Sequence, residues 1–439
     1  MDIVLVHGYN VTSTETYGVL PQRLKSLGYQ VKHVYLSKYV TLDDGIKITD
    51  IVRAFQAALL DAYGGSLPSE KFACITHSTG GLVARGWIET YYAQNMVKLP
   101  ISHLIMLSPP TNGSRLAELG KSRLSRLRSL VGIQPGLQVL DALELASQHQ
   151  WTLNSDWIDQ KLTQAPGFFT FVITGQWIDF KLLDVLAPAT YERGSDGVVR
   201  ASAANLNMQR FRVAPDGSFT LQGISNVPYL ILPKTSHSDT NCGIMGSVPA
   251  QGDHPTLAGI TAALAVKDPK SYLATAADFS QKTAALQKQE NYYNGTPLDR
   301  YCQVVFRVTD TLGGTLHDYA IELLDGNLQG DQLPAGFFAD KHQNAVNPEL
   351  FVFYLDYDVI SKVQGQLGFK IQSTSESPLV DYQEVVFNGA AAGGSLVRPN
   401  ETTFVDVIMK RRLNKNLFRL TEDTSVREID GKPGPDWIE

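Results

Sequence analysis

One segment, residues 72–85, constrains the fold of this chain more than any other. It reads FACITHSTGGLVAR. The apolar run stops abruptly at Thr76 and resumes beyond Gly80 with helical spacing, which predicts a strand, a very tight turn and a helix with Ser78 at the apex. A serine on such a turn stands clear of the backbone at the start of a helix, where main-chain amides attract negative charge. The segment therefore predicts a nucleophilic serine.

Strands and helices alternate through the first 265 residues. Apolar runs predict strands over 3–6, 31–36, 72–75, 101–107, 168–174 and 229–232. Helical spacing predicts helices over 14–26, 46–62, 80–92 and 255–264. Runs that are apolar on both faces are typical of buried parallel strands. The alternation therefore predicts a mostly parallel sheet with helices on both faces, in a domain over 1–265.

Two insertions interrupt this alternation. Residues 113–165 predict a helical excursion whose first part has leucines near one face and basic residues on the other. Residues 210–223 contain Asp216-Gly217 between two alternating segments, which is a strong hairpin signal.

The pattern changes beyond residue 265. Residues 266–299 are polar and rich in Ala, Gln and Lys, which predicts a helical connector. Strand-like segments follow at 302–309, 319–324, 350–357, 367–373, 402–410 and 417–420, separated by Gly, Pro, Asn and Asp. Residues 300–439 therefore predict a C-terminal all-β domain, most simply a sandwich.

Composition excludes several classes of protein. The chain has 439 residues, which suggests two domains, and a net charge of −6, which argues against nucleic-acid binding. No apolar stretch is long enough for a transmembrane helix, and the N-terminus lacks a secretory signal. We expect a cytoplasmic protein, unless a leader was removed or export uses another route. Cys74, Cys242 and Cys302 form no Cys-x-x-Cys, which argues against a zinc site or a disulfide framework.

Four features in a fixed order resemble the α/β-hydrolase superfamily, and within it bacterial lipases and esterases. They are the turn around Ser78, a His-Gly pair after the first strand, the sequence SDGVV at 195–199 and a later histidine. One position departs from the family's Gly-x-Ser-x-Gly pattern, because Thr76 replaces the first glycine. The resemblance covers residues 1–265 and implies an α/β-hydrolase fold with a serine nucleophile and no cofactor or metal.

A serine hydroxyl is a weak nucleophile that needs a histidine and a carboxylate, which follow it along the chain in this superfamily. Asp196 is the candidate acid, since it lies in a glycine-flanked loop after the strand at 168–174. Its competitors are Asp179 and Asp184 on the approach to that loop, and Asp239, which lies too close to the histidine. The alternative interpretation of Asp196 is a turn-forming residue in Asp-Gly.

His237 is the candidate base. It follows the predicted strand at 229–232 and precedes the closing helix, as the superfamily order requires. His254 is the rival, although its His-Pro pair is typical of the start of that helix.

An oxyanion hole needs two amides directed at the developing charge. We expect one from Thr79, directly after the nucleophile. The resemblance of the His-Gly pair to the oxyanion loop of lipases indicates Tyr9 as the other. His7 is expected to fix this loop, and the role of Asn10 stays open.

The predicted function is hydrolysis of a lipid acyl ester through an acyl-enzyme. The excursion at 113–165 has the size and position of a lid, and its apolar and basic faces suit contact with a lipid surface. A solvated cap over the pocket is the alternative. Two other functions stay open: a hydrolase of small esters or amides, and a non-catalytic binding protein on a hydrolase scaffold. The sequence leaves the oligomeric state undetermined.

Overall fold

The computed structural model describes residues 1–8, 14–34, 44–117, 136–178, 192–289, 298–363, 365–374, 377, 379–391, 395–415 and 437–438. The chain forms two compact units. The first comprises 1–208, 223–303 and 399–402, and the second comprises 209–222, 304–398 and 403–439. The predicted limits of the connector, at residues 266 and 299, stay a prediction.

The first unit is built on a parallel six-stranded sheet with the order β2-β1-β3-β4-β5-β8. The strands are β1 (Asp2–Val6), β2 (Gln30–Val34), β3 (Phe72–His77), β4 (Ile101–Leu107), β5 (Phe169–Gly175) and β8 (Tyr229–Leu232). All strands of this sheet except the edge strand β2 are almost wholly buried, as expected of a sheet covered on both faces. The α/β-hydrolase prediction is therefore confirmed at the level of fold.

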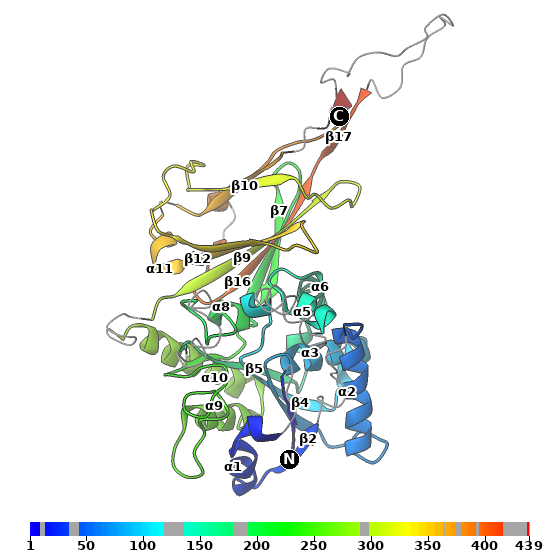
Figure 1. Ribbon diagram of the computed structural model, residues 1–439, viewed down its shortest axis with the longest axis vertical. Coiled ribbons are helices and arrows are strands. Elements are labelled where there is room, and N and C mark those ends of the chain that lie inside the picture. The colour runs from blue at the N-terminus through cyan, green and yellow to red at the C-terminus, as the bar shows by residue number, and fades with distance from the viewer. Residues whose placement is uncertain are drawn as a thin grey trace, which may run out of the picture. The chain divides into compact units, whose positions relative to one another are not determined.

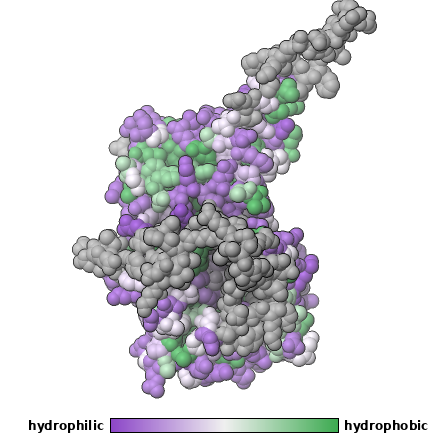
Figure 2. Space-filling model, in the orientation of Figure 1, coloured by the Kyte–Doolittle hydropathy of each residue, from purple (hydrophilic) through white to green (hydrophobic). Residues whose placement is uncertain are grey.

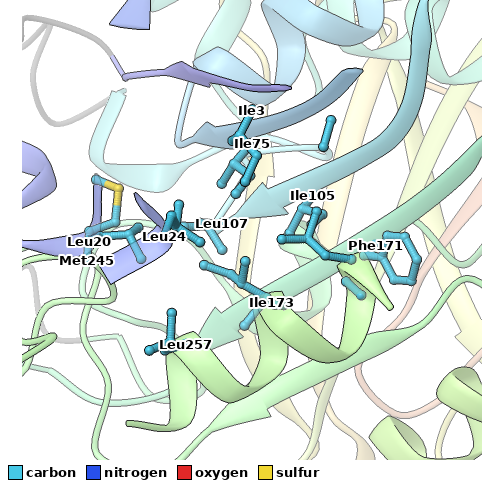
Figure 3. Packing of buried hydrophobic residues seen from close by; sticks show 14 of the residues in the cluster. Ile3, Leu20, Leu24, Ile75, Ile105, Leu107, Phe171, Ile173, Met245 and Leu257 are labelled. Carbon is cyan, nitrogen blue, oxygen red and sulfur yellow. The ribbon is translucent and has the colours of Figure 1, made fainter. Parts of the chain in front are cut away.

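Alternate strand residues face opposite layers of helices. One face carries Ile3, Ile75, Ile105 and Ile173, which pack in one buried cluster with residues of α1 (Leu20–Ser26), α9 (Pro255–Leu264) and α10 (Pro269–Gln287) (Figure 3). On the other side lie α2 (Ile48–Ala62) and α3 (Gly80–Tyr92), which pack against each other (Figure 1). The period-2 pattern of the strands thus places two helical layers on one sheet.

One predicted helix is wrong in detail. The segment 14–26 forms a short 3₁₀ helix, η1 (Thr14–Tyr17), followed by α1, rather than a single helix. Gly18 separates them with φ of +53°, a left-handed conformation that ends helical hydrogen bonding. Pro21 in the first turn of α1 then suits a new helix start.

The excursion at 113–165 is described over residues 113–117 and 136–165. It contains α5 (Leu137–Leu143), α6 (Gln148–Asp159) and the 3₁₀ helix η3 (Leu162–Gln164), and α6 packs against α3. Residues 118–135, which include most of the predicted apolar and basic faces, lie outside the described residues. The lid interpretation therefore stays a prediction.

Shorter elements complete the first unit. They are the 3₁₀ helix η2 (Met96–Lys98) and α8 (Ala201–Ala204). Among the residues that the structure describes, no helix has the length and apolarity needed to cross a bilayer.

The second unit consists of β-sheets. A six-stranded sheet has the order β11-β12-β9-β16-β6-β7, and two three-stranded sheets have the orders β10-β13-β15 and β14-β17-β18. The strands are β6 (Met208–Val213), β7 (Phe219–Ile224), β9 (Tyr301–Asp310), β10 (Tyr319–Leu324), β11 (Phe338–Gln343), β12 (Leu350–Asp356), β13 (Gly368–Ser373), β14 (Val380–Tyr382), β15 (Val385–Phe387), β16 (Thr402–Met409), β17 (Arg411–Asn414) and β18 (Trp437–Ile438), with the short helices α11 (Tyr357–Ile360) and η5 (Gly389–Ala391). The predicted strand at 417–420 lies outside the described residues.

Aromatic side chains join two of these sheets face to face. The rings of Phe306 on β9 and Phe369 on β13 lie 5.0 Å apart, and Phe211 on β6 lies 5.4 Å from Phe387 on β15. Such pairs fill the space between packed sheets. The predicted sandwich-like architecture is therefore confirmed.

The predicted hairpin at 210–223 supplies two strands of this second unit. β6 and β7 are neighbours at the edge of the six-stranded sheet, and their turn is closed by the Ala214 amide, which donates to the Ser218 carbonyl at 2.8 Å. Gly217 adopts φ of +81°, as the Asp-Gly signal requires. Figure 2 shows apolar residues gathered among hydrophilic ones on the visible face of this unit.

Candidate active site

Ser78 lies between β3 and α3 in a strained backbone conformation. Its φ is +53°, which is uncommon for a residue with a side chain. The Ser78 amide donates to the Leu107 carbonyl at 2.9 Å, and the Ser78 carbonyl accepts from the Gly81 amide at 2.9 Å. Strain of this kind costs about 1–3 kcal/mol and clusters at functional sites. The strand, tight turn and helix predicted around Ser78 are thus present.

Two glycines allow the end of β1 to approach this turn. A Cβ atom on Gly80 would lie 2.7 Å from the His7 carbonyl oxygen and 2.8 Å from that of Val6. A Cβ atom on Gly8 would lie 2.7 Å from the Ser78 Cβ. Any side chain at either position would push the backbone that follows β1 away from Ser78 and the start of α3. Gly8, which closely follows β1, therefore lies directly against Ser78.

Thr76 occupies the position where the family pattern has glycine. Its side chain is buried, and a Cβ atom on Gly81 would lie 3.5 Å from the Thr76 Oγ1. The same atom would lie 2.9 Å from the Pro109 Cβ. The absence of a side chain at Gly81 thus makes room for Pro109, whereas the distance to Thr76 is that of an ordinary van der Waals contact.

Asp196 lies in the loop that precedes α8, with its carboxylate fully buried. Its Oδ2 lies 2.9 Å from the His237 Nδ1, and its Oδ1 accepts the amides of Val198 at 3.0 Å and Val199 at 2.8 Å. Burial alone would raise the pKa of Asp196. The neighbouring His237 and the hydrogen bonds from His237, Val199 and Ser108 outweigh burial and hold the pKa below its usual value. The carboxylate is therefore ionised at neutral pH.

His237 follows β8 and is joined to Asp196 by two hydrogen bonds. Its amide donates to the Asp196 carbonyl at 2.9 Å, in addition to the side-chain contact. Because Nδ1 faces the carboxylate, Nε2 is the nitrogen left to take a proton. No hydrogen bond joins the Ser78 hydroxyl to His237 in the described structure. Such bonds are often long in enzymes without substrate.

The predicted oxyanion-hole residues are described in part. Thr79 is the N-cap residue of α3, so its amide lies at the positive end of that helix. Tyr9 and Asn10 lie outside the described residues. His7 is buried and its Nδ1 donates to the Gly8 carbonyl at 2.9 Å. Burial lowers the pKa of His7, although this hydrogen bond opposes the shift. A neutral His7 thus holds the Gly8 carbonyl, and its expected role in fixing the rest of the loop stays a prediction.

The two rival residues that the structure describes, His254 and Asp239, have other partners. The imidazole of His254 accepts the Thr256 amide at 3.3 Å and caps α9, as its His-Pro sequence indicates. The Asp239 carboxylate accepts the Asn241 amide within its own loop. Asp179 and Asp184 lie outside the described residues.

Sequence reasoning missed two residues that contact this site. Ser108, which directly follows β4, is fully buried with φ of +47°. Its hydroxyl lies 3.3 Å from the Thr174 hydroxyl and is near enough to the Asp196 carboxylate to lower the pKa of Asp196. His77, which precedes the nucleophile, contacts the backbone of His237 through its Nε2 at 3.0 Å. A polar residue at the end of a buried apolar run was the available signal for both.

A second set of polar contacts holds the loop that carries Asp196. Arg200 is buried, and its Nη2 donates to the Glu192 Oε1 at 2.6 Å, across the loop. Its Nη1 donates to the Gln303 Oε1 at 3.2 Å, and the Gln303 Nε2 donates to the Asn112 carbonyl at 3.1 Å. Gln303 thus joins the acid loop to the segment that follows β4.

No metal site accompanies these residues in the part of the chain that the structure describes. The described residues contain no group of three or more His, Cys, Asp or Glu side chains placed to hold a metal ion. Cys74 is buried inside β3, and burial raises the pKa of its thiol, so the thiolate does not form at neutral pH.

Comparison with known proteins identifies the family. No protein-family model and no curated protein sequence matches the chain. Two solved structures of the phospholipase PlaB from Legionella pneumophila match the whole of both chains with a TM-score of 0.89. The identity is 35% for one, and 34% for the other, which is a complex with thio-NAD. This chain therefore belongs to the family of Legionella pneumophila phospholipase PlaB, within the α/β-hydrolase superfamily.

Proposed function

We propose that this chain is a serine hydrolase that cleaves the acyl ester bond of lipids, with Ser78, His237 and Asp196 as its catalytic triad. The observation that carries the proposal is the buried Asp196–His237 pair, whose loop contacts the residue next to Ser78. Nucleophile, base and acid thus come from neighbouring loops at the ends of parallel strands. The family relationship to a phospholipase supports a lipid substrate.

The proposed reaction follows from these positions. The Ser78 oxygen attacks the ester carbonyl carbon while its proton passes to the His237 Nε2, and Asp196 stabilises the imidazolium. The amides of Thr79 and Tyr9 bind the oxyanion. His237 then protonates the departing alcohol. Water attacks the acyl-enzyme, gives a proton to His237 and releases the fatty acid, and Ser78 regains its proton.

We further propose that the enzyme contacts the surface of lipid aggregates. The second unit supports this with exposed apolar side chains, which include Leu312, Phe338 and Val346. Sedimentation with phospholipid vesicles measures this contact. Protein that stays in the supernatant at every vesicle concentration while it hydrolyses dispersed esters would contradict it.

The nucleophile is tested by labelling with a fluorophosphonate, read by intact and peptide mass. We expect a single adduct on Ser78 that is absent from Ser78→Ala and forms far more slowly in His237→Ala. Removal of either group reduces turnover by about 10⁶-fold in a well-studied serine protease. An adduct on another serine, or none on the folded protein, would overturn the assignment.

The substrate class is tested with esters of increasing acyl length, presented below and above the concentration at which they aggregate. We expect kcat/KM to increase with chain length and the rate to rise on aggregation. A preference for short, soluble esters would indicate a small-molecule esterase. Lack of turnover in a folded protein would favour a binding protein on a hydrolase scaffold.

A further inference from the structure

His77 is a buried residue for which the proposed reaction has no role. It is the last residue of β3 and directly precedes Ser78. Its Nε2 lies 3.0 Å from the backbone carbonyl oxygen of His237, 160 residues away in the sequence. The two imidazole rings also lie 4.7 Å apart, with an angle of 44° between their planes. The residue next to the nucleophile thus contacts both the backbone and the ring of the base.

The contact fixes where the proton of His77 lies. A carbonyl oxygen can only accept, so Nε2 carries the proton and donates it. Burial, and after it the neighbouring His237, lower the pKa of His77 to about 3. The ring is therefore neutral at physiological pH.

A neutral donor suits this place better than a charged one. The Asp196 carboxylate is close enough to influence His77 electrostatically. A cation at His77 would compete with His237 for that carboxylate, whereas a neutral ring leaves the Asp196–His237 pair intact. The ring also supports the position of the His237 side chain by direct packing.

We propose that His77 is a positioning residue for the catalytic base: its Nε2–H holds the His237 carbonyl and places the base loop against the turn that carries Ser78. The proposal rests on the assignment of His237 as the base. Because the hydrogen bond joins the end of β3 directly to the base loop, its removal lets the base move relative to the nucleophile. A displacement of about 1 Å at a reacting group can reduce the rate about 100-fold.

The test compares two replacements of His77. His77→Phe keeps an aromatic ring but removes the donor, and His77→Gln keeps an N–H donor without a ring. We expect kcat on a soluble ester to fall about 10- to 100-fold in His77→Phe with KM within about 2-fold, and His77→Gln to recover most of the loss. The rate of fluorophosphonate labelling should follow kcat. The pH at half-maximal kcat/KM should shift in His77→Phe only.

His103 provides a matched control. It is also buried on a strand of the same sheet, and its Nε2 donates to a backbone carbonyl, that of Val266, at 2.8 Å. His103→Phe removes the same kind of bond without touching His237, so it should lower stability and leave kcat and the pH profile unchanged. Should His77→Phe not fold, His77→Met replaces it as the variant without a donor.

The outcomes separate this proposal from the proposed function. Wild-type kcat and pH profile in His77→Phe, together with inactive Ser78→Ala and His237→Ala, would overturn the positioning role alone. Full activity in His237→Ala would overturn the assignment of the base and the positioning role with it. Equal effects of His77→Phe and His103→Phe on kcat would reduce His77 to a residue needed for stability.

Discussion

The two sides of the proposed active site are built in different ways. The nucleophile turn is one continuous segment, and the space around it is set by Gly8, Gly80 and Gly81. The acid and base loops lie 41 residues apart and are held by hydrogen bonds between them and to distant residues such as Gln303. Excluded volume therefore positions the nucleophile, whereas polar contacts over long sequence distances position its partners. The first arrangement is sensitive to added atoms, and the second to lost hydrogen bonds.

The largest effect is expected from Asp196→Asn. An amide in this place donates to the His237 Nδ1 and stabilises the wrong tautomer, so kcat should fall about 10³- to 10⁴-fold. Steady-state kinetics on a soluble ester measures this. Asp216→Asn is the control, because Asp216 also precedes a glycine and accepts a backbone amide, that of Ser218 at 2.9 Å, in an exposed hairpin. A loss below 10-fold in Asp196→Asn would remove Asp196 from the triad.

Gly80→Ala should have the next largest effect. Its added methyl group would lie within 2.8 Å of two backbone oxygens at the end of β1, so the strand end must move away from Ser78. We expect kcat to fall about 100-fold, and the free energy of unfolding to decrease by about 1–3 kcal/mol. Urea denaturation and ester kinetics measure both quantities.

The same helix provides the control for that substitution. In Gly86→Ala the added methyl group would meet only a side-chain methyl group of Val52, at 3.0 Å, and alanine favours the helix by about 1 kcal/mol. Activity should be retained. Equal losses in the two variants would refute the view that backbone contact at Gly80 sets the position of the nucleophile.

Gln303→Met tests the polar side of the comparison at a distance from the reacting atoms. Methionine has a similar size but cannot join Arg200 to the Asn112 carbonyl. Because buried groups then lose partners, we expect a loss of about 1–3 kcal/mol in stability and a fall in kcat of about 10-fold. Gln383→Met, at an exposed position, is the matched control. Unchanged kcat at Gln303 would show that the acid loop keeps its geometry without this contact.

The smallest expected effect concerns pH and stability. The folded state resists protonation of His77 down to about pH 3, whereas the unfolded chain takes up this proton near pH 6.5. The unfolded state therefore binds more protons between these values, and stability falls as the pH falls. When the pH is lowered from about 7.5 to about 5, His77 should decrease the free energy of unfolding by about 2 kcal/mol.

His77→Gln isolates that contribution. Other buried histidines, such as His149, whose pKa is lowered to about 4 by burial and by Arg85, affect both proteins alike. Urea denaturation at the two pH values should therefore give a smaller loss in the variant than in the wild type. An identical loss would mean that His77 is protonated at the same pH in the folded and unfolded chains.

The sequence predicted the fold better than the details of its edges. Helical spacing predicted α3 and α9, and apolar runs predicted β4 and β8, each with the limits that the structure has. The helix predicted over 14–26 was wrong because Gly18 adopts a left-handed conformation that spacing alone does not reveal. The strands β11, β14, β15, β17 and β18 were missed. β11 is an edge strand that carries mixed polar and apolar residues, and the other four are too short to show a periodic pattern.

For the site, the order of motifs identified Ser78, Asp196 and His237 as candidates, and the structure brings the last two within 2.9 Å. The order of motifs did not indicate Ser108, His77 or Gln303. Their roles depend on partners that lie 88, 160 and 103 residues away in the sequence.

The sequence by itself determined the nucleophile turn, since sterics within a few consecutive residues decide whether a backbone can turn so tightly around Ser78. Only the tertiary structure decided how Asp196 and His237 are held. A hydrogen bond between distant residues leaves no periodic pattern in a sequence. It exists only once the folded sheet has brought the two strand ends together.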